Sequence, residues 1–316
     1  MRAVILEHGR PKVVDRPEPV PGDGEALIRV ALAGICGTDL EIARGYLDFG
    51  GIPGHEFVGV VEHAFEPTWI GKRVVGEINV GCGTCDRCAS AMERHCPTRT
   101  VLGIVGRDGA FAERVLLPVN NLHEVPAAVS NEAAVFTEPL AAAHEILEQL
   151  TPNESDRVLV LGDGRLGQLC AVVLLRAGCR VRVEGRHPEK LRRLKGFDVQ
   201  TSGPGDAAQR GFDLVIEATG SPDGLRRALE VVRPRGTIVL KSTHHGETSV
   251  DLAGMVIDEV TVVGSRCGRF EPALEHLAYD DKLTDGMITA CFSLEQADDA
   301  FARAMQPDAL KVLLAP

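Results

Sequence analysis

The sequence predicts an α/β protein in two parts, a β-rich part followed by a doubly wound parallel sheet with helices on both faces. The first 120 residues are rich in glycine and proline and carry short β-branched runs, ALIRVAL, FVGVVEH and KRVVGEI, between turns such as PGDGE. That pattern is typical of a small, curled β unit. From about residue 140, expected strands alternate with expected helices, and this alternation indicates a parallel sheet.

The length favours two domains. A chain of 316 residues exceeds the usual limit for a single hydrophobic core. We expect the β-rich domain to take residues 1–139 and to be completed by residues 266–316, where the alternation stops. Residues 140–265 then form the parallel-sheet domain, beginning with the strand RVLVLG at 157–162.

The charge of the chain excludes some partners. Asp and Glu number 45 against 34 Lys and Arg, which gives a net charge of -11 and argues against nucleic acid or an anionic membrane as partner. The first apolar run is interrupted by Glu7 and His8, too early for a signal peptide, and no stretch approaches the length of a membrane span. We therefore expect a cytoplasmic protein with a small-molecule partner, whose nine cysteines are thiols or metal ligands.

Four of those cysteines fall in one short loop, residues 81–97. Cys82, Cys85, Cys88 and Cys96 have the spacing C-x2-C-x2-C-x7-C. Four thiolates close the coordination of a tetrahedral zinc ion and leave no position for substrate, so the loop predicts a structural zinc site. Buried or disulfide-bonded cysteines are the alternative, but C-x-x-C spacing in a reducing compartment favours a metal.

A dinucleotide fingerprint opens the parallel-sheet domain. Gly162, Gly164 and Gly167 form G-x-G-x-x-G between an expected strand and an expected helix. The first glycine allows the tight turn, the second lets the backbone approach a pyrophosphate, and the third packs the helix on the strand. We expect these glycines to bind the cofactor, together with Arg165 and Leu166 between them and Thr219 after a later strand.

The end of the next strand bears on the choice of nicotinamide cofactor. NAD-binding folds place an acidic residue there for the ribose 2′-hydroxyl. In VRVEGRHPEKL the strand can end at Glu184 or at Gly185. If Gly185 holds the acidic position, Arg186 and His187 follow it directly in a basic stretch that suits a 2′-phosphate. This interpretation favours NADP; if Glu184 binds ribose instead, NAD is the cofactor.

Five motifs, in this order along nearly the whole chain, carry a family resemblance. GICGTDL, PGHEFVGVV, the four-cysteine loop, TEPLAAAHE and the glycine fingerprint resemble those of the zinc-dependent medium-chain dehydrogenase/reductase family, of the alcohol and polyol dehydrogenase type. The resemblance implies a GroES-like β-rich catalytic domain and a Rossmann dinucleotide-binding domain. It also implies a catalytic zinc beside the structural one, and a homodimer or homotetramer.

The same resemblance implies roles for five residues. Cys36, His55 and Glu138 would hold the catalytic zinc, since thiolate, imidazole and carboxylate are competent ligands and three of them leave one position open. Glu56 would be a carboxylate that approaches the metal, and the hydroxyl of Thr38 would bond the substrate oxygen and begin a proton relay. Taken singly, each ligand has an ordinary explanation, such as a buried thiol or a charge at a helix start.

These features together predict a zinc-dependent oxidoreductase. It would transfer hydride between a secondary alcohol, polyol or sugar-like, and NADP(H) or NAD(H). A zinc-free enoyl or quinone reductase on the same fold, or a non-catalytic binding protein, is the alternative. Glu41 stands where many relatives carry a histidine that passes the proton on, so the proton route stays open. His244 and His245 follow a strand whose end approaches the cofactor in such folds.

Overall fold

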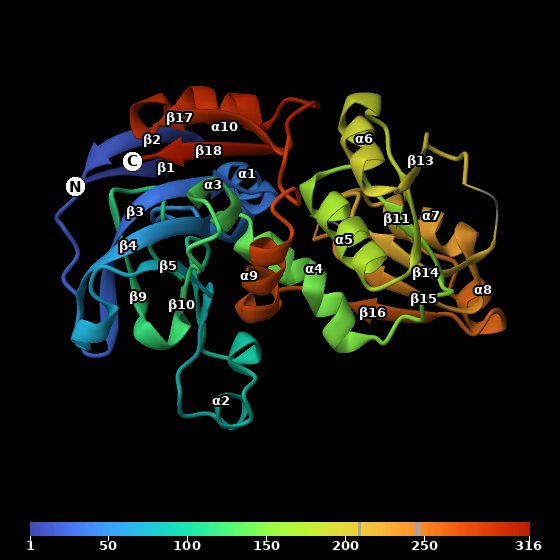
Figure 1. Ribbon diagram of the computed structural model, residues 1–316, viewed down its shortest axis with the longest axis horizontal. Helices are drawn as coiled ribbons and strands as arrows, with labels where there is room; N and C mark the ends of the chain where they lie inside the picture. The colour runs from blue at the N-terminus through green and yellow to red at the C-terminus, as the bar shows by residue number, and fades with distance from the viewer. Residues whose placement is uncertain (208–209, 244–246) are drawn as a thin grey trace. The chain divides into compact units, whose positions relative to one another are not determined.

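The protein forms two compact units in the computed structural model shown in Figure 1, which describes residues 1–207, 210–243 and 247–316. Unit 1 comprises residues 1–138 and 270–316, and unit 2 comprises residues 139–269. The boundary falls near the start of helix α4 (Thr137–Gln149). His244 and His245 lie outside the described residues.

Unit 1 is built on a mixed sheet of order β10-β5-β4-β3-β18-β17, with β9 also paired to β3. Only β17 and β18 run parallel to each other among these described strands. The strands are β3 (Glu25–Ile35), β4 (Glu56–Ala64), β5 (Arg73–Gly76), β9 (Arg114–Pro118), β10 (Leu122–Glu124), β17 (Ile288–Ser293) and β18 (Lys311–Ala315).

Smaller elements complete unit 1. A hairpin and a small second sheet contain β1 (Arg2–Glu7), β2 (Arg10–Asp15), β6 (Asn79–Val80), β7 (Thr100–Leu102) and β8 (Gly106–Arg107). The helices are α1 (Gly37–Ala43), α2 (Asp86–Ala89), α3 (Asn131–Ala134), α9 (Phe270–Tyr279) and α10 (Ala297–Ala304).

Strand β3 is the strand of this sheet that pairs with the most neighbours among those described. Its side chains are largely buried because it pairs with β4, β9 and β18. Gly34, next to the end of β3, lies opposite Glu56 of β4 on one side and Leu313 of β18 on the other. The residues that follow β3 and precede β4 are therefore brought close together, although the chain between them is long.

Unit 2 is a parallel sheet of order β13-β12-β11-β14-β15-β16. This is the 3-2-1-4-5-6 order of a doubly wound dinucleotide fold, in which ligands bind outside the carboxyl ends of the strands where the order reverses. The strands are β11 (Arg157–Leu161), β12 (Arg180–Glu184), β13 (Gln200–Ser202), β14 (Phe212–Glu217), β15 (Val232–Leu240) and β16 (Thr261–Gly264).

The sheet of unit 2 is covered by helices. Helix α5 packs on β11 and β12, and α7 packs on β14 and β15, around core side chains such as Leu159, Val215 and Ile238. The helices, besides α4, are α5 (Arg165–Arg176), α6 (Pro188–Leu194), α7 (Gly224–Val231) and α8 (Leu252–Ile257). The α/β class predicted from the sequence, β-rich part plus doubly wound parallel sheet, is confirmed. Among the described residues, no helix combines the length and the apolar character needed to cross a membrane.

Candidate functional site

Unit 1 contains a buried cluster of three metal-ligand side chains. One donor atom each from Cys36, His55 and Glu56 lies within 4.8 Å of the others. Cys36 directly follows β3 and Glu56 begins β4, so the antiparallel pairing of these strands brings the three together. His55 and Glu56 are 3 % and 1 % exposed. Thiolate and imidazole in a site sheltered from water form a donor set that suits zinc.

The carboxylate of Asp39 holds this cluster in place. It is the third residue of α1, and its carboxylate accepts hydrogen bonds from the N–H groups of Cys36 (2.7 Å) and Gly54 (3.2 Å). Its Oδ1 also lies 3.4 Å from Nδ1 of His55. A carboxylate beside one ring nitrogen orients the imidazole and leaves the other nitrogen, Nε2, for a metal. Burial lowers the pKa of His55, but the charges of Asp39 and Cys36 and the hydrogen bonds to them together outweigh burial and hold that pKa well above its ordinary value.

Glu56 is paired with a fully buried lysine. Nζ of Lys311, the first residue of β18, donates to Oε2 of Glu56 and lies 5.6 Å from the centre of the Phe136 ring. A side chain at Gly34 would place its Cβ 2.8 Å from the same Glu56 oxygen, so this glycine leaves room for the ion pair. The sequence analysis missed Lys311, for which the only signal was its place at the head of the closing strand KVLL.

Other predicted site residues of unit 1 lie near this cluster or apart from it. Oγ1 of Thr38 is 3.9 Å from Sγ of Cys36. Glu41 is bonded to Arg44 at 2.5 Å on the surface of α1. Glu138 is partly buried near the start of α4, and its carboxylate is not among the donor atoms that lie within 4.8 Å of one another. Its role as third ligand stays a prediction, and Glu56 takes the third place in the described cluster.

The four cysteines of the loop converge as a second cluster. Cys82, Cys85, Cys88 and Cys96 have sulfurs within 4.8 Å of one another. Sγ of Cys85 lies 3.5 Å from that of Cys88 and 3.8 Å from that of Cys96, while sulfurs bound tetrahedrally at the usual zinc distance lie about 3.8 Å apart. Hydrogen bonds from Thr84 and from backbone N–H groups lower the pKa of Cys82 to about 5, which favours the thiolate that a metal needs. All four are free cysteines, so the disulfide alternative does not hold.

The glycine fingerprint shapes a pocket of about 620 Å³ at the carboxyl ends of the strands of unit 2. Nothing lies within 4 Å of a Cβ built on Gly164, which leaves open space for a pyrophosphate above the backbone. A Cβ on Gly167 would meet the Gly162 carbonyl at 2.2 Å, so this glycine serves helix-to-strand packing. The predicted residues that line the pocket are Gly162, Gly164, Gly185, Arg186, His187 and Thr219, whereas Arg165, Leu166 and Gly167 are not among its lining residues.

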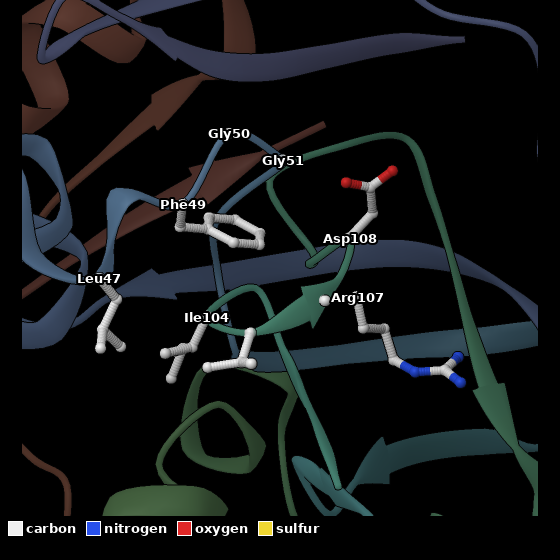
Figure 2. Close-up of a pocket in the computed structure, with 9 residues that line it drawn as sticks. Leu47, Phe49, Gly50, Gly51, Ile104, Arg107 and Asp108 are labelled. Atoms are coloured by element: carbon white, nitrogen blue, oxygen red, sulfur yellow. The ribbon is translucent and has the colours of Figure 1, made fainter. Parts of the chain in front are cut away.

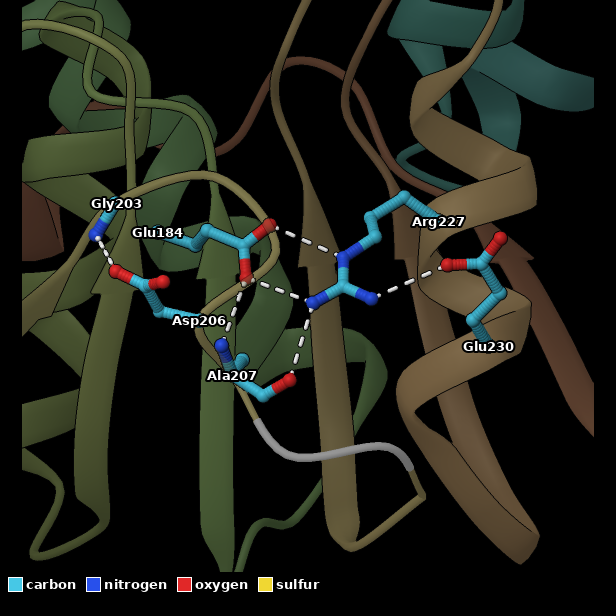
Figure 3. Close-up of polar contacts among 6 residues, drawn as sticks. All are labelled: Glu184, Gly203, Asp206, Ala207, Arg227 and Glu230. Atoms are coloured by element: carbon cyan, nitrogen blue, oxygen red, sulfur yellow. Dashed lines mark hydrogen bonds and ion pairs between the residues drawn. The ribbon is translucent and has the colours of Figure 1, made fainter.

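Glu184, the last residue of β12, forms an ion pair with Arg227 (Figure 3). Its carboxylate oxygens accept from Nε (3.0 Å) and Nη2 (2.9 Å) of Arg227 on α7, and one also accepts from the Ala207 N–H at 3.4 Å. Burial opposes its ionisation, but the bonds from Arg227 and from backbone N–H groups hold the pKa of Glu184 below its usual value. Arg227 lies 43 residues away, and no local sequence signal pairs the two.

Glu184 ends β12 and is paired with Arg227, and Gly185 directly follows it. Arg186 is exposed and makes no hydrogen bond or ion pair within the part of the chain that the structure describes, and it lines the pocket. His187 is bonded to Asp163, the residue between the first two glycines of the fingerprint. An unpaired guanidinium after a glycine suits a 2′-phosphate.

A second cavity of about 560 Å³ lies in unit 1 between residues 47–51 and 104–108 (Figure 2). The side chains of Leu47, Phe49 and Ile104 form apolar walls. Oδ1 of Asp108 accepts the Ile52 N–H at 2.9 Å and so holds the two loops together. Gly51 of this cavity is four residues from His55, which bounds their separation at about 14 Å of chain.

Two family models match the chain. The alcohol dehydrogenase GroES-like domain matches residues 22–127, and the glucose dehydrogenase C-terminus matches residues 131–315. Among curated proteins, the L-threonine 3-dehydrogenase of Streptomyces coelicolor is 34% identical over 99% of both chains. The sorbitol dehydrogenase of Halalkalibacterium halodurans is 29% identical over 100% of this chain and 99% of its own.

Solved structures are similar to this one over the whole chain. An alcohol dehydrogenase of Escherichia coli CFT073 complexed with NADH has a TM-score of 0.91 at 28% identity, covering 100% of this chain and 99% of its own. A protein of Sinorhizobium meliloti 1021 described as a zinc-binding dehydrogenase, bound to NADP, gives the same TM-score, identity and coverage. Both nicotinamide cofactors are thus found in structures similar to this one.

The first prediction concerns metal content. The purified protein should hold two zinc ions per chain, one for each cluster. Cys36→Ser should hold one, because it removes a thiolate from the buried cluster and leaves the four-cysteine loop intact. Inductively coupled plasma mass spectrometry measures the ratio, with the exposed Cys291→Ser as control. A Cys36→Ser protein that keeps two zinc ions would contradict the assignment.

The second prediction concerns the ion pair of unit 2. Arg227→Met leaves the Glu184 carboxylate, 7 % exposed, without its partner, and should lower the free energy of unfolding by about 3 kcal/mol near neutral pH. Because the pKa of Glu184 is lowered in the folded state, its contribution is present above the ordinary value of 4.5 and is lost as the pH falls through the lowered one. The loss caused by Arg227→Met should therefore shrink in acid.

Denaturant unfolding at several pH values tests the second prediction. Arg226→Met is the matched control, because this neighbour on α7 is 59 % exposed and pairs only with the exposed Asp223 among described residues. Equal, small effects of the two substitutions at neutral pH would show that the Glu184 pair does not stabilise the unit.

Proposed function

Because the chain belongs to the zinc-dependent medium-chain dehydrogenase/reductase family, we propose that it oxidises a secondary alcohol of the polyol or sugar-like class with NADP, in the cytoplasm. Cys36, His55 and Glu138 would hold the catalytic zinc, and the four cysteines the structural one. The reaction converts the alcohol and NADP⁺ to the ketone, NADPH and a proton.

The buried cluster of Cys36, His55 and Glu56 is the observation that carries the proposal. A zinc ion bound there would polarise the oxygen of the alcohol. The protein's own part is to fix the donor atoms: Asp39 orients the His55 ring, and Lys311 neutralises the Glu56 carboxylate. The Thr38 hydroxyl, 3.9 Å from Sγ of Cys36, would accept the proton of the alcohol by hydrogen bond and pass it on.

The cavity at residues 47–51 and 104–108 would take the part of the substrate remote from the reacting carbon. Leu47, Phe49 and Ile104 offer apolar surface, which suits the C–H faces of a sugar-like chain. The glycines 50, 51 and 106 line the same cavity, and their peptide groups can bind hydroxyls without a side chain in the way.

We propose NADP as the preferred cofactor on the grounds of Glu184 and Arg186. The first is paired with Arg227 through both of its carboxylate oxygens. The second is exposed at the pocket directly after a glycine. An NADP complex among the similar structures supports this choice, while an NADH complex keeps NAD as the alternative.

We propose a homodimer or homotetramer formed through unit 2. Its edge strand β16 borders no further strand in the described sheet. Leu252, Val256 and Ile257 of the neighbouring α8 are 66 %, 76 % and 79 % exposed. Apolar side chains beside an open strand edge are typical of an interface. Light scattering coupled to size-exclusion chromatography checks the assembly, and a monomer at micromolar concentration would contradict it.

A substrate panel tests the function. Polyols, sugars, amino alcohols and simple primary alcohols are followed by nicotinamide absorbance with each cofactor. The highest kcat/KM is expected for a polyol or sugar with a secondary hydroxyl, and Cys36→Ser should abolish turnover. Activity on enoyl or quinone substrates that survives Cys36→Ser would favour the zinc-free reductase instead.

The third prediction concerns cofactor choice. Arg186→Ala should raise the KM for NADP about tenfold or more and leave the KM for NAD nearly unchanged, because a charged hydrogen bond to the 2′-phosphate is lost. Arg192→Ala is the control, since Arg192 is an exposed arginine of α6 that does not line the pocket. Equal changes for both cofactors would remove the argument for a 2′-phosphate site at Arg186.

A further inference from the structure

The glycine fingerprint carries a buried carboxylate. Asp163 lies between Gly162 and Gly164, and its side chain is 8 % exposed. A Cβ built on Gly185 would fall 2.5 Å from both Cβ and Oδ2 of Asp163. Contacts this short do not occur between real atoms, so the Asp163 side chain fills the volume that any side chain at position 185 would need.

The pocket therefore contains an acidic side chain, Asp163, that comes from the fingerprint loop and not from a strand. Folds that bind NAD carry a carboxylate at the strand end to hold the ribose 2′-hydroxyl. Here the strand-end acid, Glu184, is paired with Arg227 and is followed by Gly185, and a second carboxylate, that of Asp163, comes from the glycine loop. Oδ2 of Asp163 accepts the N–H of His187 at 2.6 Å, and Oδ1 lies 3.0 Å from Nδ1 of the same ring.

The bonds of Asp163 connect the fingerprint loop to residues 185–187, the turn that follows β12. Gln168 of α5, which is fully buried, reinforces this connection. Its Nε2 donates to the carbonyls of Asp163 (3.1 Å) and Lys190 (3.2 Å), and its Oε1 accepts from Arg193 at 3.0 Å. The fingerprint loop and residues 185–193 are thereby held as one body.

We propose that Asp163 is a positioning residue for the 2′-phosphate of NADP. By holding His187, it fixes the turn of residues 185–187 and leaves Arg186 to meet the phosphate. A carboxylate close to a phosphate would repel it, but here both oxygens of Asp163 face His187. This proposal rests on the NADP preference proposed above, and it explains why an acid can sit in a pocket that accepts a phosphate.

The alternative role of Asp163 makes the opposite prediction. If its carboxylate bound the ribose hydroxyls directly, it would take the role of the strand-end acid Glu184, which is paired with Arg227, and favour NAD. The two roles are separated by ligands that differ only in the 2′-phosphate, and binding alone is sufficient to measure them.

The experiment is calorimetric titration of the purified full-length protein with adenosine 2′,5′-bisphosphate and with 5′-AMP. The wild type should bind the bisphosphate more tightly. Asp163→Ala should lower that preference at least tenfold and change the affinity for 5′-AMP less than threefold. Gly185→Ala keeps every charge but pushes its Cβ against Asp163, and it should lower the preference in the same direction.

Matched variants keep the test decisive. Asp163→Asn retains an acceptor for the His187 N–H and should lose less of the preference than Asp163→Ala. Glu189→Ala removes an exposed carboxylate of α6 that does not line the pocket, and it should leave the preference unchanged. Thermal unfolding confirms that each variant is folded. If Asp163→Ala is not folded, Asp163→Asn and Gly185→Ala serve as the test.

Three results would overturn the proposal. If Asp163→Ala weakens 5′-AMP as much as the bisphosphate, Asp163 only maintains the loop. If it weakens 5′-AMP more, Asp163 binds the ribose itself, and if it strengthens the bisphosphate, Asp163 merely repels phosphate. A wild type without preference between the two ligands would instead remove the NADP assignment, and the role of Asp163 with it.

Discussion

The buried cluster of Cys36, His55 and Glu56 in unit 1 depends on one buried carboxylate, that of Asp39. It is fully buried, caps the start of α1 through the Cys36 N–H, accepts the Gly54 N–H and approaches Nδ1 of His55. A thiolate that follows one strand and an imidazole that precedes the next are thus fixed against a single group. Without that carboxylate, two buried N–H groups would lack a partner, and the ring of His55 would lose its orientation.

The cofactor pocket of unit 2 likewise depends on the contacts that its carboxylates make. Two carboxylates that could have met the ribose are each bound by a basic side chain, Glu184 by Arg227 and Asp163 by His187. Arg186, which directly follows Gly185, is exposed at the pocket. The proposed preference for NADP thus rests on which acids are already paired as well as on the exposed Arg186.

The sequence predicted the fold because its signals were local, while the roles of the predicted site residues stay predictions. Strand and helix alternation, the four-cysteine spacing and the glycine fingerprint each lie within a short stretch of chain, and the structure has all of them. Lys311 and Arg227 were missed because their partners lie 255 and 43 residues away, and only the sheet register and a helix crossing bring them together. Asp39 stands in the motif GICGTDL, but its role depends on contacts with Gly54 and His55 that no local pattern shows. Asp163 appeared only as a variable position between two glycines.

The central claim is that a zinc ion belongs among the side chains that surround Cys36 and His55, apart from the four-cysteine loop. An anomalous difference map, measured from crystals of the purified protein on both sides of the zinc absorption edge, tests it most directly. Two peaks per chain are expected, one among the sulfurs of the loop and one in contact with Sγ of Cys36 and Nε2 of His55. A single peak, confined to the four cysteines, would contradict it.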